Sequence, residues 1–351
     1  METDFENLEW KEFFLNDVFN EIQRGKRLKK RDHKKGTTPY VSSTSLNNGI
    51  DDFVGNSEKV RHFSNCLTIA NSGSVGSTFY QPFKFVASDH VTKLKNDNFN
   101  KYIYQFISIL CIRLNVKYSF NREINDSRIQ REKILLPTTL KGEPDYAFME
   151  QYMRIKVQEK IDQYSIYIKP RLEQLKDFKK VEPLEKKEWE EFEIEKIFKV
   201  KSGKRLTKSD MKKGTKPFIG ATDSNNGITE FVSNTNVSED CNVLGVNYNG
   251  SVVENFYHPY KAIFSDDVKR LSFKEVKGNK HLFLFVKGQI LKQKEKYQYG
   301  YKFNGKRMNN QKILLPVTNK NKPDYAYMEN YMKQIEFKKL NQYLAFTQTK
   351  V

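Results

Sequence analysis

An internal duplication constrains this chain more than any other feature of its 351 residues. Short motifs occur twice, in the same order and about 178 residues apart. The matching pairs are Trp10–Phe13 with Trp189–Phe192, Gly25–Leu28 with Gly203–Leu206, Asn47–Ile50 with Asn225–Ile228, Gly73–Val75 with Gly250–Val252, Lys133–Pro137 with Lys312–Pro316, and Pro144–Ala147 with Pro323–Ala326. A period of this size is a domain length rather than a solenoid unit. The sequence therefore predicts two tandem copies of one domain.

Each copy begins with a mixed region and ends with a helical one. Short β-branched or aromatic runs separated by turn residues predict strands in the first copy, at residues 66–70, 78–80, 83–86 and 91–94. Apolar helices are expected at 101–114 and 279–292. The fold class predicted is α+β: two homologous α/β-mixed domains at 1–143 and 183–322, each followed by a long helix, at 144–182 and 323–351.

Both long helices carry an apolar seam. In the first helix the apolar residues step by four and three, as in a heptad; they are Met149, Met153, Val157, Ile161, Tyr164, Ile168, Leu172 and Leu175. In the second helix the seam of Tyr325, Met328, Met332 and Ile335 weakens at Lys339. The pattern predicts that the two helices pack antiparallel, although each helix could instead lie on its own domain. Pro170 is expected to kink or divide the first helix.

Charge indicates the class of partner. The formal net charge is +18, and both copies contribute to it. This suits a polyanion, first nucleic acid and second an anionic membrane surface, although a protein can simply be rich in lysine. No apolar run reaches the ~20 residues of a spanning helix. The acidic N-terminus and three widely spaced cysteines, Cys66, Cys111 and Cys241, predict a cytoplasmic protein without disulfides or a zinc site.

Catalytic motifs are absent or incomplete. The sequence has no dinucleotide-type glycine fingerprint and no Asn-Pro-Pro-Tyr or Asp-Pro-Pro-Tyr tetrapeptide. The segment 300–307 follows phosphate-loop spacing, but Arg307 stands where a hydroxyl residue should hold Mg²⁺. Asp324 and Glu336 resemble part of a nuclease metal site, yet they are expected about 18 Å apart on one helix. We therefore predict no catalytic residue, no metal site and no cofactor bound by this chain.

Three repeated polar segments are candidates for contacts with DNA. The first is basic and suits phosphates; its residues are Lys26, Arg27, Lys29 and Lys30, with Lys204, Arg205 and Lys208 in the second copy. The second is rich in Asn, Gly and Ser and is either a DNA-binding loop or an ordinary tight turn; its residues are Asn71, Ser72 and Ser74, with Asn247, Asn249 and Ser251. The third mixes aromatic, Arg and Asn residues and differs between the copies; its residues are Tyr118, Asn121, Arg122 and Arg128, with Tyr299, Lys302, Arg307, Asn309 and Asn310.

With these motifs in order and duplicated, the chain resembles the specificity subunits of type I restriction–modification systems and of the related two-subunit type IIB systems. The resemblance implies two target-recognition domains that read the halves of a split double-stranded DNA site, and two helices that act as a ruler. It also implies partners that dock on the helices: methyltransferase or fused methyltransferase–nuclease subunits, which would use S-adenosylmethionine and Mg²⁺. The chain's compact size favours type IIB. The alternatives are an active nuclease or methyltransferase with a divergent site, and a nonspecific basic nucleic-acid-binding scaffold.

Overall fold

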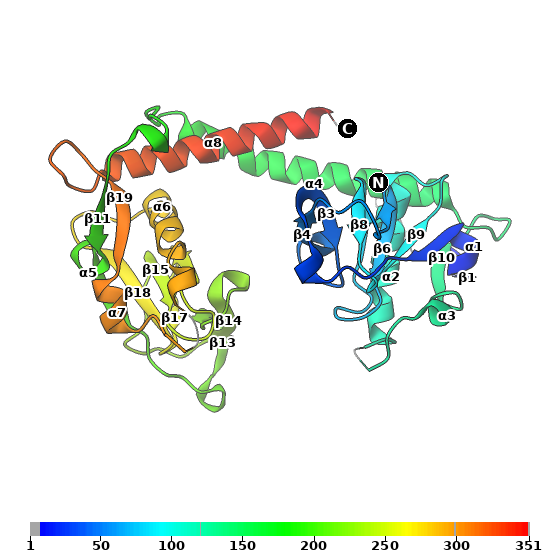
Figure 1. The fold of residues 1–351 in the computed structure, drawn as a ribbon, viewed down its shortest axis with the longest axis horizontal. Helices are drawn as coiled ribbons and strands as arrows, with labels where there is room; N and C mark the ends of the chain where they lie inside the picture. The colour runs from blue at the N-terminus through cyan, green and yellow to red at the C-terminus, as the bar shows by residue number, and fades with distance from the viewer. Residues whose placement is uncertain (1–7, 120, 298–299, 350–351) are drawn as a thin grey trace. The chain divides into compact units, whose positions relative to one another are not determined.

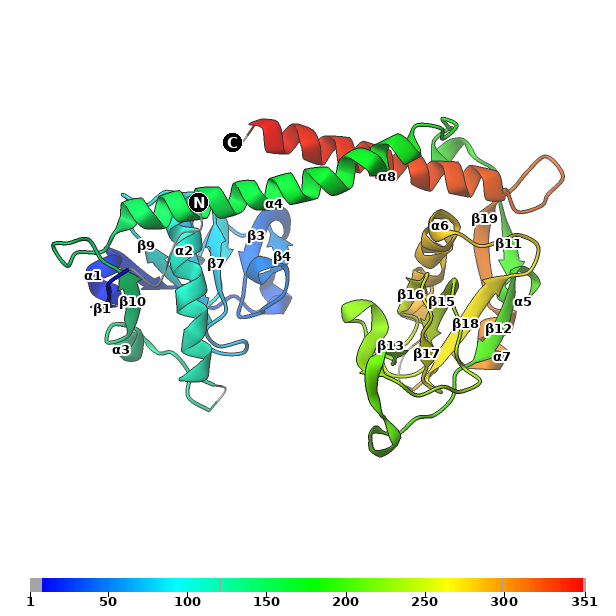
Figure 2. The same ribbon diagram turned by 180° about the vertical axis from the view of Figure 1, so that it is seen from behind.

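The structure is a computed structural model that describes residues 8–119, 121–297 and 300–349. The chain divides into unit 1, residues 1–164, and unit 2, residues 165–351, with the boundary inside the long helix α4 (Tyr146–Leu175). Each unit is a strand-rich body with a long helix along one side (Figures 1 and 2). Among the residues described, no helix is both long enough and apolar enough to cross a bilayer.

Unit 1 is built on two sheets and a short strand pair. The strands are β1 (Trp10–Phe14), β2 (Glu21–Arg24), β3 (Lys35–Val41), β4 (Ile50–Val54), β5 (His62–Phe63), β6 (Cys66–Ala70), β7 (Thr78–Gln81), β8 (Phe85–Ala87), β9 (Val91–Lys95) and β10 (Lys133–Pro137). The helices before α4 are α1 (Leu15–Val18), α2 (Lys101–Ile112) and α3 (Asp126–Ile129). The sheets have the orders β2-β9-β6-β7 and β4-β3-β8-β5, and β1 pairs with β10.

Unit 2 repeats this plan. Its strands are β11 (Trp189–Glu193), β12 (Phe198–Ser202), β13 (Lys213–Ile219), β14 (Ile228–Val232), β15 (Val243–Asn247), β16 (Asn255–His258), β17 (Ile263–Phe264), β18 (Val268–Phe273) and β19 (Lys312–Pro316). Its helices are α5 (Ile194–Ile197), α6 (Lys280–Leu291), α7 (Gly305–Asn310) and α8 (Tyr325–Thr349). The sheet orders are β12-β18-β15-β16 and β14-β13-β17, with β11 on β19. The shared strand order confirms the predicted duplication and the α+β class.

The core of each unit lies between the first sheet and an apolar helix. In unit 1 the alternating residues Leu67 and Ile69 of β6 pack with Ile103 and Ile107 of α2. In unit 2 Leu244 and Val246 of β15 join the corresponding cluster around α6. The side-chain amides of Asn100 and Asn279 cap these helices by accepting two backbone N–H groups each. The four strands and the two apolar helices predicted from sequence are present, with ends shifted by two residues at most.

The glycine of the repeated Gly-Lys-Arg motif is explained by a close backbone approach. A Cβ atom on Gly25 would lie 2.1 Å from the carbonyl oxygen of Ser88, and one on Gly203 would lie 1.9 Å from that of Ser265. No side chain fits at either place. The glycine therefore lets the segment after β2 or β12 lie directly against the turn before β9 or β18.

Of the two outcomes expected at Pro170, a kink or a division of the first long helix, the structure excludes the division. Helix α4 continues through Pro170 to Leu175. Proline removes one backbone donor from the helix, at a cost of about 3 kcal/mol in a free helix. Here Ile168 and Leu175, on either side of Pro170, are 0% and 1% exposed. Burial of these two side chains offsets the lost hydrogen bond and keeps the helix continuous.

Within unit 2, the end of α4 and the segment after it pack along α8. Arg171 donates to Glu336 from Nε and Nη2, at 2.8 and 3.0 Å. Further along the chain, the backbone N–H of Lys179 donates to Asn330 Oδ1 at 2.8 Å. Residue numbers rise on one side of the contact and fall on the other, so the two segments run antiparallel, as predicted.

Candidate nucleic-acid interface

The predicted site residues fall into three classes of exposure. Exposed are Lys26, Arg27, Lys29, Lys30, Asn121, Arg122, Arg128, Lys204, Arg205, Lys208 and Asn310. Half-buried are Ser74, Asn249, Ser251, Lys302, Arg307 and Asn309. Buried are Asn71, Ser72, Tyr118 and Asn247, and Tyr299 lies outside the described residues. For the first two classes, contact with DNA stays a prediction.

The four buried residues correct the sequence interpretation, because their polar atoms bond within the protein. The hydroxyl of Tyr118 donates to the Glu132 carboxylate. The Asn247 amide donates to the carbonyl of Thr222 at 2.9 Å. The Ser72 hydroxyl lies 2.6 Å from Nδ1 of His90. These side chains, and that of Asn71, support the surrounding loops instead of presenting their polar atoms to a ligand.

In unit 1 the structure brings all three polar segments together. The backbone N–H groups of Gly25 and Lys26 donate to Val91 and Ala87, on either side of the β8–β9 turn. Asn71 N–H donates to His90 O in the same turn, at 2.8 Å, and Ile124 N–H donates to Asn71 O at 3.0 Å. The first and second segments therefore converge on the turn at residues 88–90, and the third segment joins them through Asn71.

Unit 2 has the same convergence for its first two segments. Gly203 N–H donates to Val268 O, and Tyr248 N–H donates to Asp267 O. These bonds align Tyr248 with Asn71 and Asn249 with Ser72. The motif pair Gly73–Val75 and Gly250–Val252 implies the same alignment.

The third segment contains the same hydrogen-bonding arrangement around an arginine in both units. Asn125 Oδ1 accepts the backbone N–H of Arg128 at 2.9 Å, and Asn304 Oδ1 accepts that of Arg307 at 3.1 Å. Each arginine then donates from Nη1 to a carbonyl five residues earlier, that of Glu123 or Lys302. A cation held in the same way in both units is suited to phosphate, the part of DNA that does not vary with sequence.

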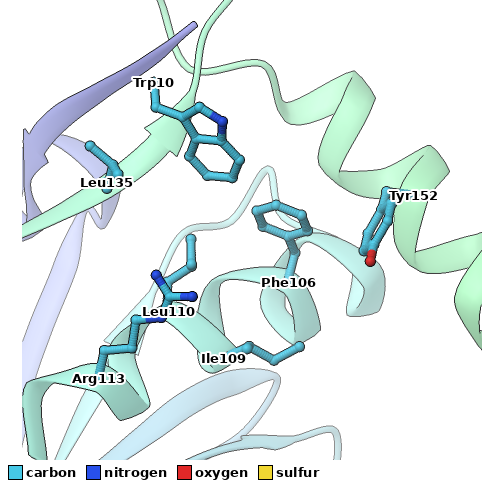
Figure 3. A pocket seen from close by; sticks show the side chains of 7 residues that line it. All are labelled: Trp10, Phe106, Ile109, Leu110, Arg113, Leu135 and Tyr152. Atoms are coloured by element: carbon cyan, nitrogen blue, oxygen red, sulfur yellow. The ribbon is translucent and has the colours of Figure 1, made fainter. Parts of the chain in front are cut away.

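An apolar pocket of about 520 Å³ lies elsewhere on unit 1, beside the first turns of α4. Figure 3 shows the rings of Trp10, Phe106 and Tyr152 around it, with Ile109 from α2 and Arg113, the residue directly after α2. Unit 2 keeps the aromatic frame, with Trp189 stacked on Phe285 at 6.0 Å and Tyr331 edge-on to Phe285. At the positions of Ile109 and Leu110, however, α6 carries Gly288 and Gln289. The pocket is thus a feature of unit 1 and does not belong to the shared polar surface.

The carboxylates that resembled a nuclease site have other partners. Asp324 accepts the backbone N–H of Tyr327 at 2.9 Å and pairs with Lys187, also at 2.9 Å. Glu336 is bound by Arg171. Across residues 8–119, 121–297 and 300–349, no three His, Cys, Asp or Glu side chains are grouped so that they could hold a metal ion.

Comparison with known proteins gives consistent matches. The model of the family "Type I restriction modification DNA specificity domain" matches twice, at residues 7–179 and 186–344. The type II restriction enzyme specificity subunit S.BcgI of Heyndrickxia coagulans is 42% identical over 336 residues, which cover 94% of this chain and 96% of the relative. The crystal structure of a type I restriction–modification S subunit from M. genitalium has a similar fold, with a TM-score of 0.51, 15% identity, and coverage of 99% of this chain and 94% of the other.

Proposed function

The chain belongs to the family of type I restriction modification DNA specificity domain proteins, and from this premise we propose that it reads a bipartite, asymmetric site in double-stranded DNA. The observation that carries the proposal is the duplicated convergence of polar segments on one turn in each unit. Each unit would read one half of the site. Because the two polar surfaces differ in their side chains, the two half-sites would differ in sequence.

The charges indicate that different residues of each polar surface would contact phosphates and bases. Exposed Lys26 and Arg27 in unit 1 correspond to Lys204 and Arg205 in unit 2. Cations at matched positions suit the phosphates that every duplex shares, and they fix the position of a protein without carrying sequence information. Side chains that differ between the units are left to distinguish bases.

The reaction itself would be carried out by a partner. We propose that methyltransferase or fused methyltransferase–nuclease subunits dock on the long helices α4 and α8 and supply the sites for S-adenosylmethionine and Mg²⁺. The relative from H. coagulans is named as a subunit of a type II restriction enzyme. This supports the two-subunit type IIB arrangement over type I.

Selection from a random pool of duplex DNA tests the proposal. The complex of this chain with its methyltransferase partner should enrich two short, different motifs at a fixed separation. Lys26→Ala should lower recovery of all sequences alike, because a phosphate contact is blind to sequence. Enrichment of no motif would favour a nonspecific basic scaffold. Methylation or cleavage of DNA by the purified chain alone would favour an enzyme.

A further inference from the structure

One cross-strand pair at the centre of the polar surface differs between the units in an ordered way. Arg24, the last residue of β2, is opposite Thr92 of β9. At the matching register of unit 2, Ser202 of β12 is opposite Lys269 of β18. Both pairs consist of one cation and one hydroxyl. The cation stands on the first strand in unit 1 and on its neighbour in unit 2.

In unit 1 the cation is held by buried neighbours. The Asn71 amide, 0% exposed, lies between Arg24 and Thr92. With its oxygen turned toward the guanidinium, Asn71 accepts from Nε and Nη2 of Arg24 at 2.9 and 3.3 Å and donates to the Thr92 hydroxyl at 2.9 Å. The Asp126 carboxylate is also near, 3.8 Å from Nε of Arg24. The Arg24 side chain remains 31% exposed, so the held guanidinium is still accessible to a ligand.

In unit 2 the cation is held by different groups. Lys269 Nζ donates to the Ser202 hydroxyl at 2.8 Å and lies 4.7 Å from the centre of the Tyr248 ring. Burial lowers the pKa of Lys269, while Asp266 and Asp267 act to raise it. Asn249 donates to Asp267 Oδ1 at 2.9 Å beside this group. Both cations thus have carboxylates nearby, but unit 1 presents a guanidinium held by a buried amide and unit 2 presents an ammonium held by a serine hydroxyl.

The backbone around the cross-strand pair is similar in the two units, so the units differ mainly in the side chains of the pair and their partners. Gly25 and Gly203 hold the first segment against the same turn, and the two basic residues directly after each glycine match. A contact that positions DNA is expected to be common to both units, and a contact that distinguishes bases is expected to differ. At the cross-strand pair the backbone arrangement is the same in both units, but the hydrogen-bonding groups differ.

We propose that Arg24 with Thr92, and Ser202 with Lys269, form the position at which each unit selects a base. The inference rests on the proposed function and names its specificity-determining residues. In unit 1 the guanidinium of Arg24 suits a base edge with two acceptors, such as O6 and N7 of guanine in the major groove. In unit 2 the donor and carboxylate together suit an edge that presents an acceptor beside a donor.

Exchange of the pair between units tests the inference. The double variant Arg24→Ser with Thr92→Lys gives unit 1 the pair of unit 2, and Ser202→Arg with Lys269→Thr does the reverse. Each is assayed, in complex with the methyltransferase partner, by selection from random duplex DNA. We expect the preference at one base pair of one half-site to fall by at least about 10-fold, with the other half-site unchanged in the same molecule.

Three controls separate the outcomes. Arg24→Lys keeps the charge but removes the planar fork, so it should lose the base preference and keep overall affinity. The unchanged half-site and the thermal midpoint report whether a variant is folded. A wild-type complex that enriches a split motif, with exchange variants that enrich the identical motif, would overturn the inference and leave the proposed function standing. A wild-type complex that enriches no motif would overturn both.

Discussion

At the scale of single residues, the most instructive difference between the units lies beneath the third polar segment. In unit 1 the buried Glu132 accepts from the Tyr118 hydroxyl and, at 2.8 Å, from Nζ of Lys117. In unit 2 Gln311 takes this place and accepts from Tyr297 and Lys296 at 2.7 and 3.0 Å. Burial, followed by the bond to Glu132, raises the pKa of Tyr118 to about 12. The geometry of acceptor, tyrosine and lysine is thus kept, while the acceptor's charge is not.

This equivalence predicts how unit 1 tolerates change at Glu132. Glu132→Gln keeps an acceptor for Tyr118, and Lys117 is 52% exposed and can bond to water instead, so the loss in unfolding free energy should be about 1 kcal/mol or less. Glu132→Ala leaves a buried hydroxyl unpaired and should cost about 2–3 kcal/mol. Urea unfolding of the full chain measures both. Equal losses for the two variants would show that the charge, not the hydrogen bond, stabilises this place.

Sequence alone could predict exposed site residues but not buried ones. Lys26 and Arg27 follow a glycine in a charged run, and such side chains are seldom buried. An amide such as Asn71 has no such bias, because its place depends on which neighbours can bond to it. The pairing of Arg24 with Thr92 joins residues 68 positions apart, and their register is set by the sheet. Comparing the motifs of the two copies does not reveal which residues of neighbouring strands lie opposite each other.

At the scale of elements, the contact between α4 and α8 within unit 2 contains a carboxylate with three cationic or imidazole partners. Burial acts to raise the pKa of Glu336, but its bonds to Arg171, Lys280 and His281 outweigh burial and bring the pKa to about 2. The partners come from α4 and α6, and Glu336 itself is 18% exposed. This carboxylate of α8 bonds to residues of α4 and α6, and it therefore stabilises the packing of these three helices within unit 2.

A depressed pKa fixes the direction of the pH dependence. In the unfolded chain Glu336 titrates near 4.5, so its contribution is fully present above that pH and is lost as the pH falls toward 2. The full contribution is up to about 3 kcal/mol. Glu336→Gln should therefore lower stability at pH 7, and its difference from wild type should shrink by roughly half or more at pH 3. Thermal unfolding at the two pH values measures this.

A surface pair provides the matched control. Glu173 bonds to Lys176 with both side chains more than half exposed, so Glu173→Gln should change stability little at either pH. If Glu336→Gln behaved like Glu173→Gln, the bonds around Glu336 would not be what holds α8 to the end of α4.

The helices and strands were largely predictable because their sequence patterns occur in both copies of the domain. Alternating apolar runs gave the strands around residues 66–94, and the apolar seams gave both long helices. The pairing of β1 with β10 was not predictable, since it joins strands more than 100 residues apart in the chain. A division of α4 at Pro170 was one of the two outcomes predicted, because a local rule for proline ignores the buried side chains on either side.

At the scale of the whole molecule, two similar units share a chain in which α4 begins in unit 1 and ends in unit 2. Under the proposed function, this helix is the covalent element that could set the distance between two half-sites. A helix rises about 1.5 Å per residue, and seven residues make nearly two whole turns. Removing seven residues therefore shortens a helix by about 10.5 Å with little change in the direction its faces point.

Deletion of residues 156–162 from α4 should then shorten the preferred gap between the two motifs by roughly three base pairs, at about 3.4 Å per base pair. The bases within each motif should not change, because both cores and both polar surfaces remain intact. Insertion of seven residues in the turn at 318–321 changes chain length outside the helix and should leave the gap as it is. The measurement is selection from random duplex DNA, scored by motif and spacing separately. A deletion variant that still selects the wild-type spacing would mean that α4 does not set the gap, even if both motifs are read correctly.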